Sequence, residues 1–200
     1  MRLYDHWRMC RRAKGDGKNA PKGAIALYSD KDYGYIVKID DAWEIAIDGS
    51  SNMREWLENI MWFRVGKYKE AVGFRNVAED MLIDVLKHVE LGDTVNLRGH
   101  SRGGAVCQSL ALMLINRGYK VGNVVTFGAP KLGGRKFCNR AREVGLNHTR
   151  VVMRGDTVTR LPFFRGRHYD KRLIILENDI KSKIQKHISY GQYLRRIHDR

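Results

Sequence analysis

The sequence predicts an α/β domain in which a mostly parallel central sheet is flanked by helices. Between residues 94 and 153, short apolar segments alternate with longer segments of helical periodicity. This alternation is typical of parallel sheets that are covered on both faces. The 200 residues correspond to the length of one domain. A hydrophobic content of 43% with only three prolines indicates an ordinary globular chain and not a disordered one.

The first half of the chain predicts a basic segment and then an antiparallel meander. Residues 1–22 are basic and weakly periodic, so we expect an N-terminal arm with a short helix, followed by the main domain over residues 23–200. Acidic turn signals separate short apolar or alternating runs, and Ser51 is suited to cap a helix. We expect strands at residues 24–28, 33–38 and 43–47, and helices at residues 51–61 and 74–88.

The second half predicts the parallel part of the sheet. An apolar strand precedes an Ala- and Leu-rich helical segment, and Gly128 and Pro130 bound the strand that follows. The carboxyl ends of such strands meet at one rim of the sheet, where we expect the functional side chains to converge. Strands are expected at residues 94–97, 123–127, 149–153 and 172–176, and helices at residues 102–117, 135–144 and 187–196.

The charge of the chain is its most unusual bulk property. The formal net charge is +15 and the pI is about 9.9, so the surface attracts polyanions such as nucleic acid or anionic lipid head groups, or it serves only solubility. No apolar run is long enough to span a membrane. The N-terminus lacks the apolar region of a signal peptide, which predicts a cytoplasmic location. Three widely spaced cysteines fit neither a disulfide framework nor a zinc site.

The most informative segment is Gly99-His100-Ser101-Arg102-Gly103, which follows an apolar strand and precedes a helix. Gly-x-Ser-x-Gly in this setting predicts a sharp turn that lifts a nucleophilic serine above the strand ends. Glycine is needed two residues before and after the serine, because a Cβ there would collide across the turn. The turn also leaves the amide of Arg102 at a helix N-terminus, where it can bind an oxyanion.

With these residues in view, the chain resembles the lipase class 3 family, the fungal-type triacylglycerol lipases and their relatives. The resemblance implies an α/β-hydrolase fold and a serine hydrolase. It extends over roughly residues 24–195, and its motifs occur in the family's order. The matching segments are residues 46–51, 54–57, 99–104, 125–133, 150–152, 156–162 and 186–190.

The resemblance implies a catalytic triad of Ser101 as nucleophile, His187 as base and Asp156 as the residue that orients the base. It also assigns the oxyanion hole to Ser50 and to the backbone amide of Arg102. His168 is the main alternative for the base, while His100 is expected to be structural. Asp170 and Asp179 are weaker alternatives for the acid, and no metal or cofactor is expected.

Two departures from the family pattern bear on the substrate. Arg102 stands where the family has leucine, and Asp48 stands where it has arginine. The expected substrate is a carboxylic ester of a lipid, and the cationic surface favours an anionic acyl ester such as a phospholipid over a neutral triglyceride. The alternative is a catalytically inactive protein of the same fold that binds an anionic membrane or nucleic acid. No recognised nucleic-acid motif occurs, which disfavours that partner.

Overall fold

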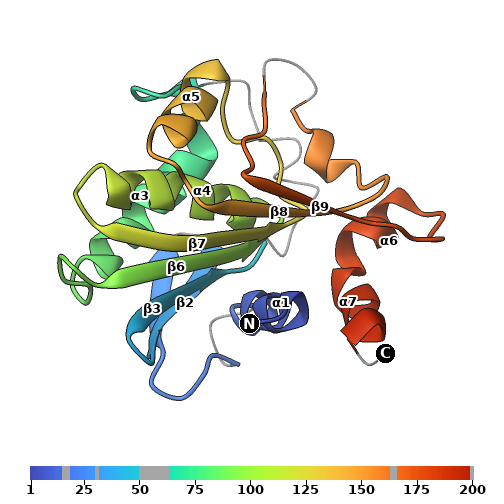
Figure 1. Ribbon diagram of the computed structural model, residues 1–200, viewed down its shortest axis with the longest axis horizontal. Helices are drawn as coiled ribbons and strands as arrows, with labels where there is room; N and C mark the ends of the chain where they lie inside the picture. Colours follow the sequence, from blue (N-terminus) through green and yellow to red (C-terminus); the bar gives the residue numbers. More distant parts are fainter. Residues whose placement is uncertain (15–18, 30–31, 50–63, 163–165, 199–200) are drawn as a thin grey trace.

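The computed structural model of the protein describes residues 1–14, 19–29, 32–49, 64–162 and 166–198. Within these residues the centre of the molecule is a seven-stranded sheet in the order β1-β2-β3-β6-β7-β8-β9. Helices lie on both faces of this sheet, and both ends of the chain are on the same side of it (Figure 1).

The first three strands form the antiparallel part of the sheet. Side chains alternate between its faces, so that Ile36 and Ile45 join the main core whereas their neighbours Tyr35 and Ala46 face a separate cluster beneath the N-terminal helix. The strands are β1 (Ile25–Ser29), β2 (Asp32–Ile39) and β3 (Ala42–Ile47), with β1 antiparallel to β2 and β2 antiparallel to β3.

The remaining strands run parallel to β3 and complete the sheet. Adjacent residues Val124 and Val125 belong to different hydrophobic clusters, one on each face, so this region is buried on both sides. The strands are β6 (Thr94–His100), β7 (Lys120–Phe127), β8 (His148–Met153) and β9 (Arg172–Leu176).

Two groups of helices cover the two faces (Figure 1). The main core lies under α3 (Val72–Val85), α4 (Arg102–Ile115) and α5 (Arg135–Glu143). A small hairpin of β4 (Arg64–Val65) and β5 (Glu70–Ala71) precedes α3, and a 3₁₀ turn spans Val158–Arg160. On the opposite side lie α1 (Leu3–Arg12), α6 (Lys183–Ile188) and α7 (Tyr190–His198).

The N-terminal helix packs against the sheet. Trp7, Met9 and Cys10 are buried beneath it, and the guanidinium of Arg98 on β6 donates to the His6 ring at 2.9 Å. Cys10, Cys107 and Cys138 are free and buried. Within the described part of the chain, every helix is too short or too polar to cross a bilayer.

One predicted helix has a different form in the structure. Residues 187–196 do not make a single helix, because the chain turns at Ser189 between α6 and α7. His187 before the turn and Tyr190 after it both point into the protein, where each is at most 1% exposed. Gly191 packs against Trp7, where a Cβ would lie 2.4 Å from the indole nitrogen. The helix predicted at residues 51–61 lies outside the described residues.

Candidate active site

Ser101 occupies the turn between β6, which ends at His100, and α4, which begins at Arg102. Its φ of 53° is positive, a conformation that costs a non-glycine residue free energy. The surrounding backbone holds it there, because the Ser101 amide donates to the carbonyl of Phe127 at 2.8 Å. The turn therefore presents the hydroxyl at the carboxyl end of the parallel strands.

The glycines beside Ser101 are required by close backbone packing. A Cβ on Gly99 would lie 2.4 Å from the carbonyl oxygen of Gly103, across the turn as predicted. A Cβ on Gly103 would lie 2.4 Å from the carbonyl oxygen of Ile47. That second collision is with the neighbouring strand β3 and not across the turn, so Gly103 brings α4 close to the sheet.

Three of the predicted site residues meet at this rim of the sheet. The Ser101 hydroxyl lies 2.8 Å from Nε2 of His187, and Nδ1 of the same ring lies 2.8 Å from Oδ2 of Asp156. All three side chains are at most 3% exposed. Asp156 follows β8 and His187 lies near the end of α6, so elements distant in sequence assemble the arrangement.

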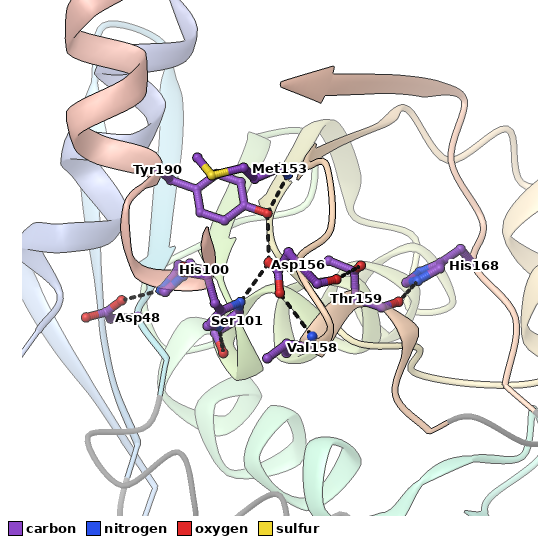
Figure 2. A network of polar contacts seen from close by, with 10 residues as sticks. Asp48, His100, Ser101, Met153, Asp156, Val158, Thr159, His168 and Tyr190 are labelled. Atoms are coloured by element: carbon purple, nitrogen blue, oxygen red, sulfur yellow. Dashed lines mark hydrogen bonds and ion pairs between the residues drawn. The ribbon is translucent and has the colours of Figure 1, made fainter. Parts of the chain in front are cut away.

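Further donors surround the Asp156 carboxylate. Its Oδ2 accepts from the hydroxyl of Tyr190 at 2.9 Å, and its Oδ1 accepts from the amide of Val158 at 3.0 Å (Figure 2). These donors contact both carboxylate oxygens and hold the Asp156 side chain in place. The carboxylate accepts a hydrogen bond from Nδ1–H of His187, which leaves Nε2 as the acceptor for the Ser101 hydroxyl. The arrangement can therefore remove a proton from Ser101.

Comparison with known proteins gives the family. The family model described as "Lipase (class 3)" matches residues 44–166, which is more than half of the chain. The chain belongs to the class 3 lipase family. The predicted family and the predicted α/β-hydrolase fold with a mostly parallel sheet are thereby confirmed.

Individual relatives agree with this assignment. The chain is 28% identical over 129 residues to the secreted mono- and diacylglycerol lipase 1 of Fusarium solani, covering 59% of this chain and 38% of that protein. It resembles the solved triacylglyceride lipase of Rhizomucor miehei with a TM-score of 0.67, at 21% identity, covering 84% and 76% of the two chains. The Lip2 lipase of Yarrowia lipolytica gives a TM-score of 0.70 at 17% identity, covering 86% and 76%. The chain thus spans under half the length of the curated relative.

The cytoplasmic location expected from the sequence is wrong on this comparison. The matched relative from Fusarium solani is named a secreted lipase. The expectation came from the lack of an apolar segment in the first residues, and that lack does not determine where a class 3 lipase acts.

The other candidate histidine of this class 3 lipase lies away from Ser101. His168 places its Nε2 2.6 Å from the carbonyl oxygen of Thr159 (Figure 2). Burial lowers the pKa of His168 to about 4, with Arg150 adding to the effect. Asp170 accepts from Arg150 at 2.9 Å, and Asp179 lies on the surface. None of these three contacts the Ser101–His187 pair among the described interactions.

His100 lies behind the His187 ring and is in contact with its backbone. Its Nε2 lies 3.1 Å from the carbonyl oxygen of His187, its Nδ1 lies 3.4 Å from Oδ1 of Asp48, and the two imidazoles stack at 4.9 Å. Asp48 in turn accepts from Arg11 of α1 at 3.2 Å. Burial alone would raise the pKa of Asp48, but His100 and Arg11 outweigh it and lower that pKa.

Of the two predicted oxyanion-hole residues, the structure describes Arg102. Ser50 lies outside the described residues. Its neighbour Gly49 is close to the nucleophile, since a Cβ on Gly49 would lie 2.8 Å from the Cβ of Ser101. Arg102 is the first residue of α4, so its backbone amide is at the helix N-terminus directly after Ser101.

Two residues of the site were not singled out from the sequence. Tyr190 bridges Asp156 and the amide of Met153, and it belongs to the motif that identified His187. Trp7 packs its ring 4.8 Å from that of His100. The position of Tyr190 three residues after His187 was an available signal, whereas the contact of Trp7 depends on how α1 packs.

Proposed function

We propose that this class 3 lipase is a serine hydrolase that cleaves carboxylic esters of lipids through Ser101, His187 and Asp156. The observation that supports it most is the unbroken chain of two 2.8 Å contacts from the Ser101 hydroxyl through the imidazole to the carboxylate. Acyl transfer by such a group needs no metal, since the imidazole supplies the base and later the acid.

The reaction follows from these contacts. As Ser101 Oγ bonds to the ester carbonyl carbon, its proton passes to Nε2 of His187, and Asp156 stabilises the imidazolium. The carbonyl oxygen becomes an oxyanion. When the intermediate collapses, the C–O bond to the alcohol breaks and Nε2 returns the proton to the leaving alcohol. Water then repeats the sequence on the acyl-enzyme, releasing the carboxylic acid and free Ser101.

The oxyanion requires preorganised donors. We propose the backbone amide of Arg102 as one donor and Ser50 as the second. Loss of one such donor typically costs about 2.7–4 kcal/mol of transition-state stabilisation. The position of Gly49 against Ser101 supports this assignment, because it brings the backbone before residue 50 next to the nucleophile.

The charge of the chain bears on the substrate. We propose a lipid ester with an anionic group, such as a phospholipid, and contact with an anionic membrane. The net charge of +15 concentrates anions at the surface, and Arg102 follows the nucleophile directly. Hydrolysis of anionic vesicles faster than zwitterionic ones, with the difference lost at high salt, is the expected result. Equal rates on both at low and high salt would remove the preference.

The nucleophile is tested by Ser101→Ala with Ser109→Ala as a matched control. Both serines are buried, but Ser109 lies within α4 and not at the turn. We expect Ser101→Ala to abolish hydrolysis of a short-chain p-nitrophenyl ester, since no other described hydroxyl contacts His187 Nε2. Thermal unfolding should stay close to that of the parent protein. Wild-type turnover in Ser101→Ala would show the nucleophile to be wrong.

A further inference from the structure

The helix that carries His187 exposes nearly all of its other residues. Of the six residues of α6, only His187 is buried. Ile184 and Ile188 are 64% and 58% exposed. They are four residues apart, so they lie on the same side of the helix. A single exposed isoleucine is ordinary, but this pair projects from the element that holds the base of the proposed triad.

Lysines flank these isoleucines along the chain, and arginines follow them on α7. Residues 178–198 contain Asp179 as their one carboxylate. The cations of this segment are Lys181, Lys183, Lys186, Arg195 and Arg196. An apolar pair flanked by lysine and arginine is the pattern of a helix that lies in the interface of a bilayer, with the apolar side chains entering and the cations contacting phosphates.

A cationic cleft continues this surface. The space between α1 and α7 has a volume of about 580 Å³, and no carboxylate occurs among the described residues that line it. Its guanidinium groups come from Arg8, Arg11, Arg12 and Arg195. Figure 1 shows α1, α6 and α7 together on one side of the sheet, opposite α3 and α4. The basic N-terminal residues and the C-terminal helices therefore contribute to one cationic side of the molecule.

Two other exposed apolar side chains lie in an acidic part of the chain. Ile83 on α3 and Leu91 after it are 62% and 68% exposed. Residues 79–93 around them contain five carboxylates and a single lysine, so an anionic surface would repel this region. Exposed apolar area alone does not distinguish the two regions, but charge does.

We infer that Ile184 and Ile188, with Lys181 and Lys183 beside them, form a docking surface for a bilayer that contains anionic phospholipid. The role we assign to this α6 surface, which is to hold the active site at its lipid substrate, rests on the proposed function. The isoleucines enter the boundary between head groups and acyl chains, and the lysines contact the lipid phosphates. His187, between the two isoleucines in sequence, points inward to Ser101 while the α6 surface faces the lipid.

The test measures cosedimentation of the protein with vesicles, using Ser101→Ala as the parent because it does not hydrolyse the lipid. One kind of vesicle is phosphatidylcholine, and the other also contains phosphatidylglycerol. We expect the parent to bind the vesicles that contain phosphatidylglycerol, and we expect the parent with Ile184→Ser and Ile188→Ser added to partition onto them roughly tenfold more weakly. The control pair Ile83→Ser and Leu91→Ser should bind as the parent does. Lys181→Glu with Lys183→Glu should lose the preference for phosphatidylglycerol.

Three results would overturn the α6 surface: equal partitioning of the parent onto both kinds of vesicle, no binding to either, or the same loss in the control pair as in the α6 pair. Hydrolysis of a soluble ester by the α6 variants that retain Ser101 should equal that of the unmodified protein. If Ser101→Ala binds vesicles as expected while the unmodified protein hydrolyses no ester, the α6 surface is supported and the proposed function is wrong. If the unmodified protein hydrolyses the ester but Ser101→Ala binds no vesicles, the proposed function is supported and the α6 surface is wrong.

Discussion

Asp48 shows how one departure from the family pattern acts at the scale of a residue. It stands where the family resemblance leads one to expect arginine, and in the structure it is 4% exposed between Arg11 and His100. Both ring nitrogens of His100 face acceptors, namely the carbonyl oxygen of His187 and the Asp48 carboxylate. Burial lowers the pKa of His100, so the neutral ring is favoured and donates from one nitrogen at a time. Asp48 contacts this ring from one side, so it is suited to hold the orientation of the ring against which His187 is stacked.

We predict that Asp48→Asn lowers kcat by about tenfold with little change in KM, because His187 loses part of its positioning. Steady-state kinetics on a soluble ester measures both constants. Asp170→Asn is the matched control, since it removes a similar contact, from Arg150 at 2.9 Å, away from Ser101. If both variants lose stability but neither loses kcat, Asp48 has a structural role only.

The residues of the candidate site differ in how far sequence could predict them. Ser101, Asp156 and His187 lie in local motifs whose types and order imply their roles, and the structure brings them together. The contact of Asp48 with Arg11 joins residues 37 positions apart, and no local pattern indicates it. Such contacts depend on how a helix docks on a sheet, which periodicity does not determine.

At the scale of elements, the approach of α4 to β3 depends on Gly103. A Cβ there would meet backbone atoms of Ile47 and Asp48 at 2.4 and 2.5 Å, and backbone cannot move aside as a side chain can. Gly73 in α3 has no atom within 4 Å of an added Cβ. Both glycines lie in the first turn of a helix, but Gly103 is closely packed against backbone whereas Gly73 has open space around it.

Gly103→Ala is expected to lower the free energy of unfolding by about 1–3 kcal/mol, the usual range for overpacking, and to reduce activity through displacement of Ser101. Gly73→Ala should stabilise by about 0.4–1 kcal/mol, because alanine restricts the unfolded chain and favours helix. Urea titration of both variants measures these differences. Equal effects of the two changes would contradict the packing of α4 described above.

Sequence predicted the strands better than the ends of the chain. Residues 172–176 were predicted as the strand that the structure shows as β9, because apolar runs between turn signals are a local pattern. The arginines of the segment before residue 22 predict an arm, whereas Trp7 and Cys10 are buried on the inner side of α1, which packs on the sheet. The C-terminal helix is predicted as one piece, whereas the structure breaks it at Ser189 and packs Gly191 against Trp7 of α1, a tertiary contact that periodicity does not show.

At the scale of the whole molecule, buried histidines make stability depend on pH. Burial lowers the pKa of His148 to about 4, although its contact with the Tyr169 carbonyl opposes the shift. Burial likewise lowers the pKa of His6 and of His168 to about 4. The unfolded chain protonates these groups near pH 6.5, so between about pH 6.5 and pH 4 it binds more protons than the folded protein does.

The sign of this effect is a loss of stability as pH falls through that window. We expect His148 alone to contribute about 2–3 kcal/mol of the loss between pH 6.5 and pH 4, which urea unfolding at several pH values would measure. His148→Gln should flatten the dependence, and the exposed His88→Gln should leave it unchanged. A free energy of unfolding that is constant from pH 7 to pH 4.5 would contradict the burial of uncharged histidines.

The proposed activity depends on one nucleophile activated by one imidazole at the rim of the parallel sheet. The most direct measurement is peptide mapping of the native protein after reaction with a fluorophosphonate, which bonds covalently to an activated serine. We predict a single adduct on Ser101 and strongly reduced labelling in His187→Gln, because the hydroxyl then lacks its proton acceptor. Labelling that is absent from Ser101, or that is equal with and without His187, would contradict the account.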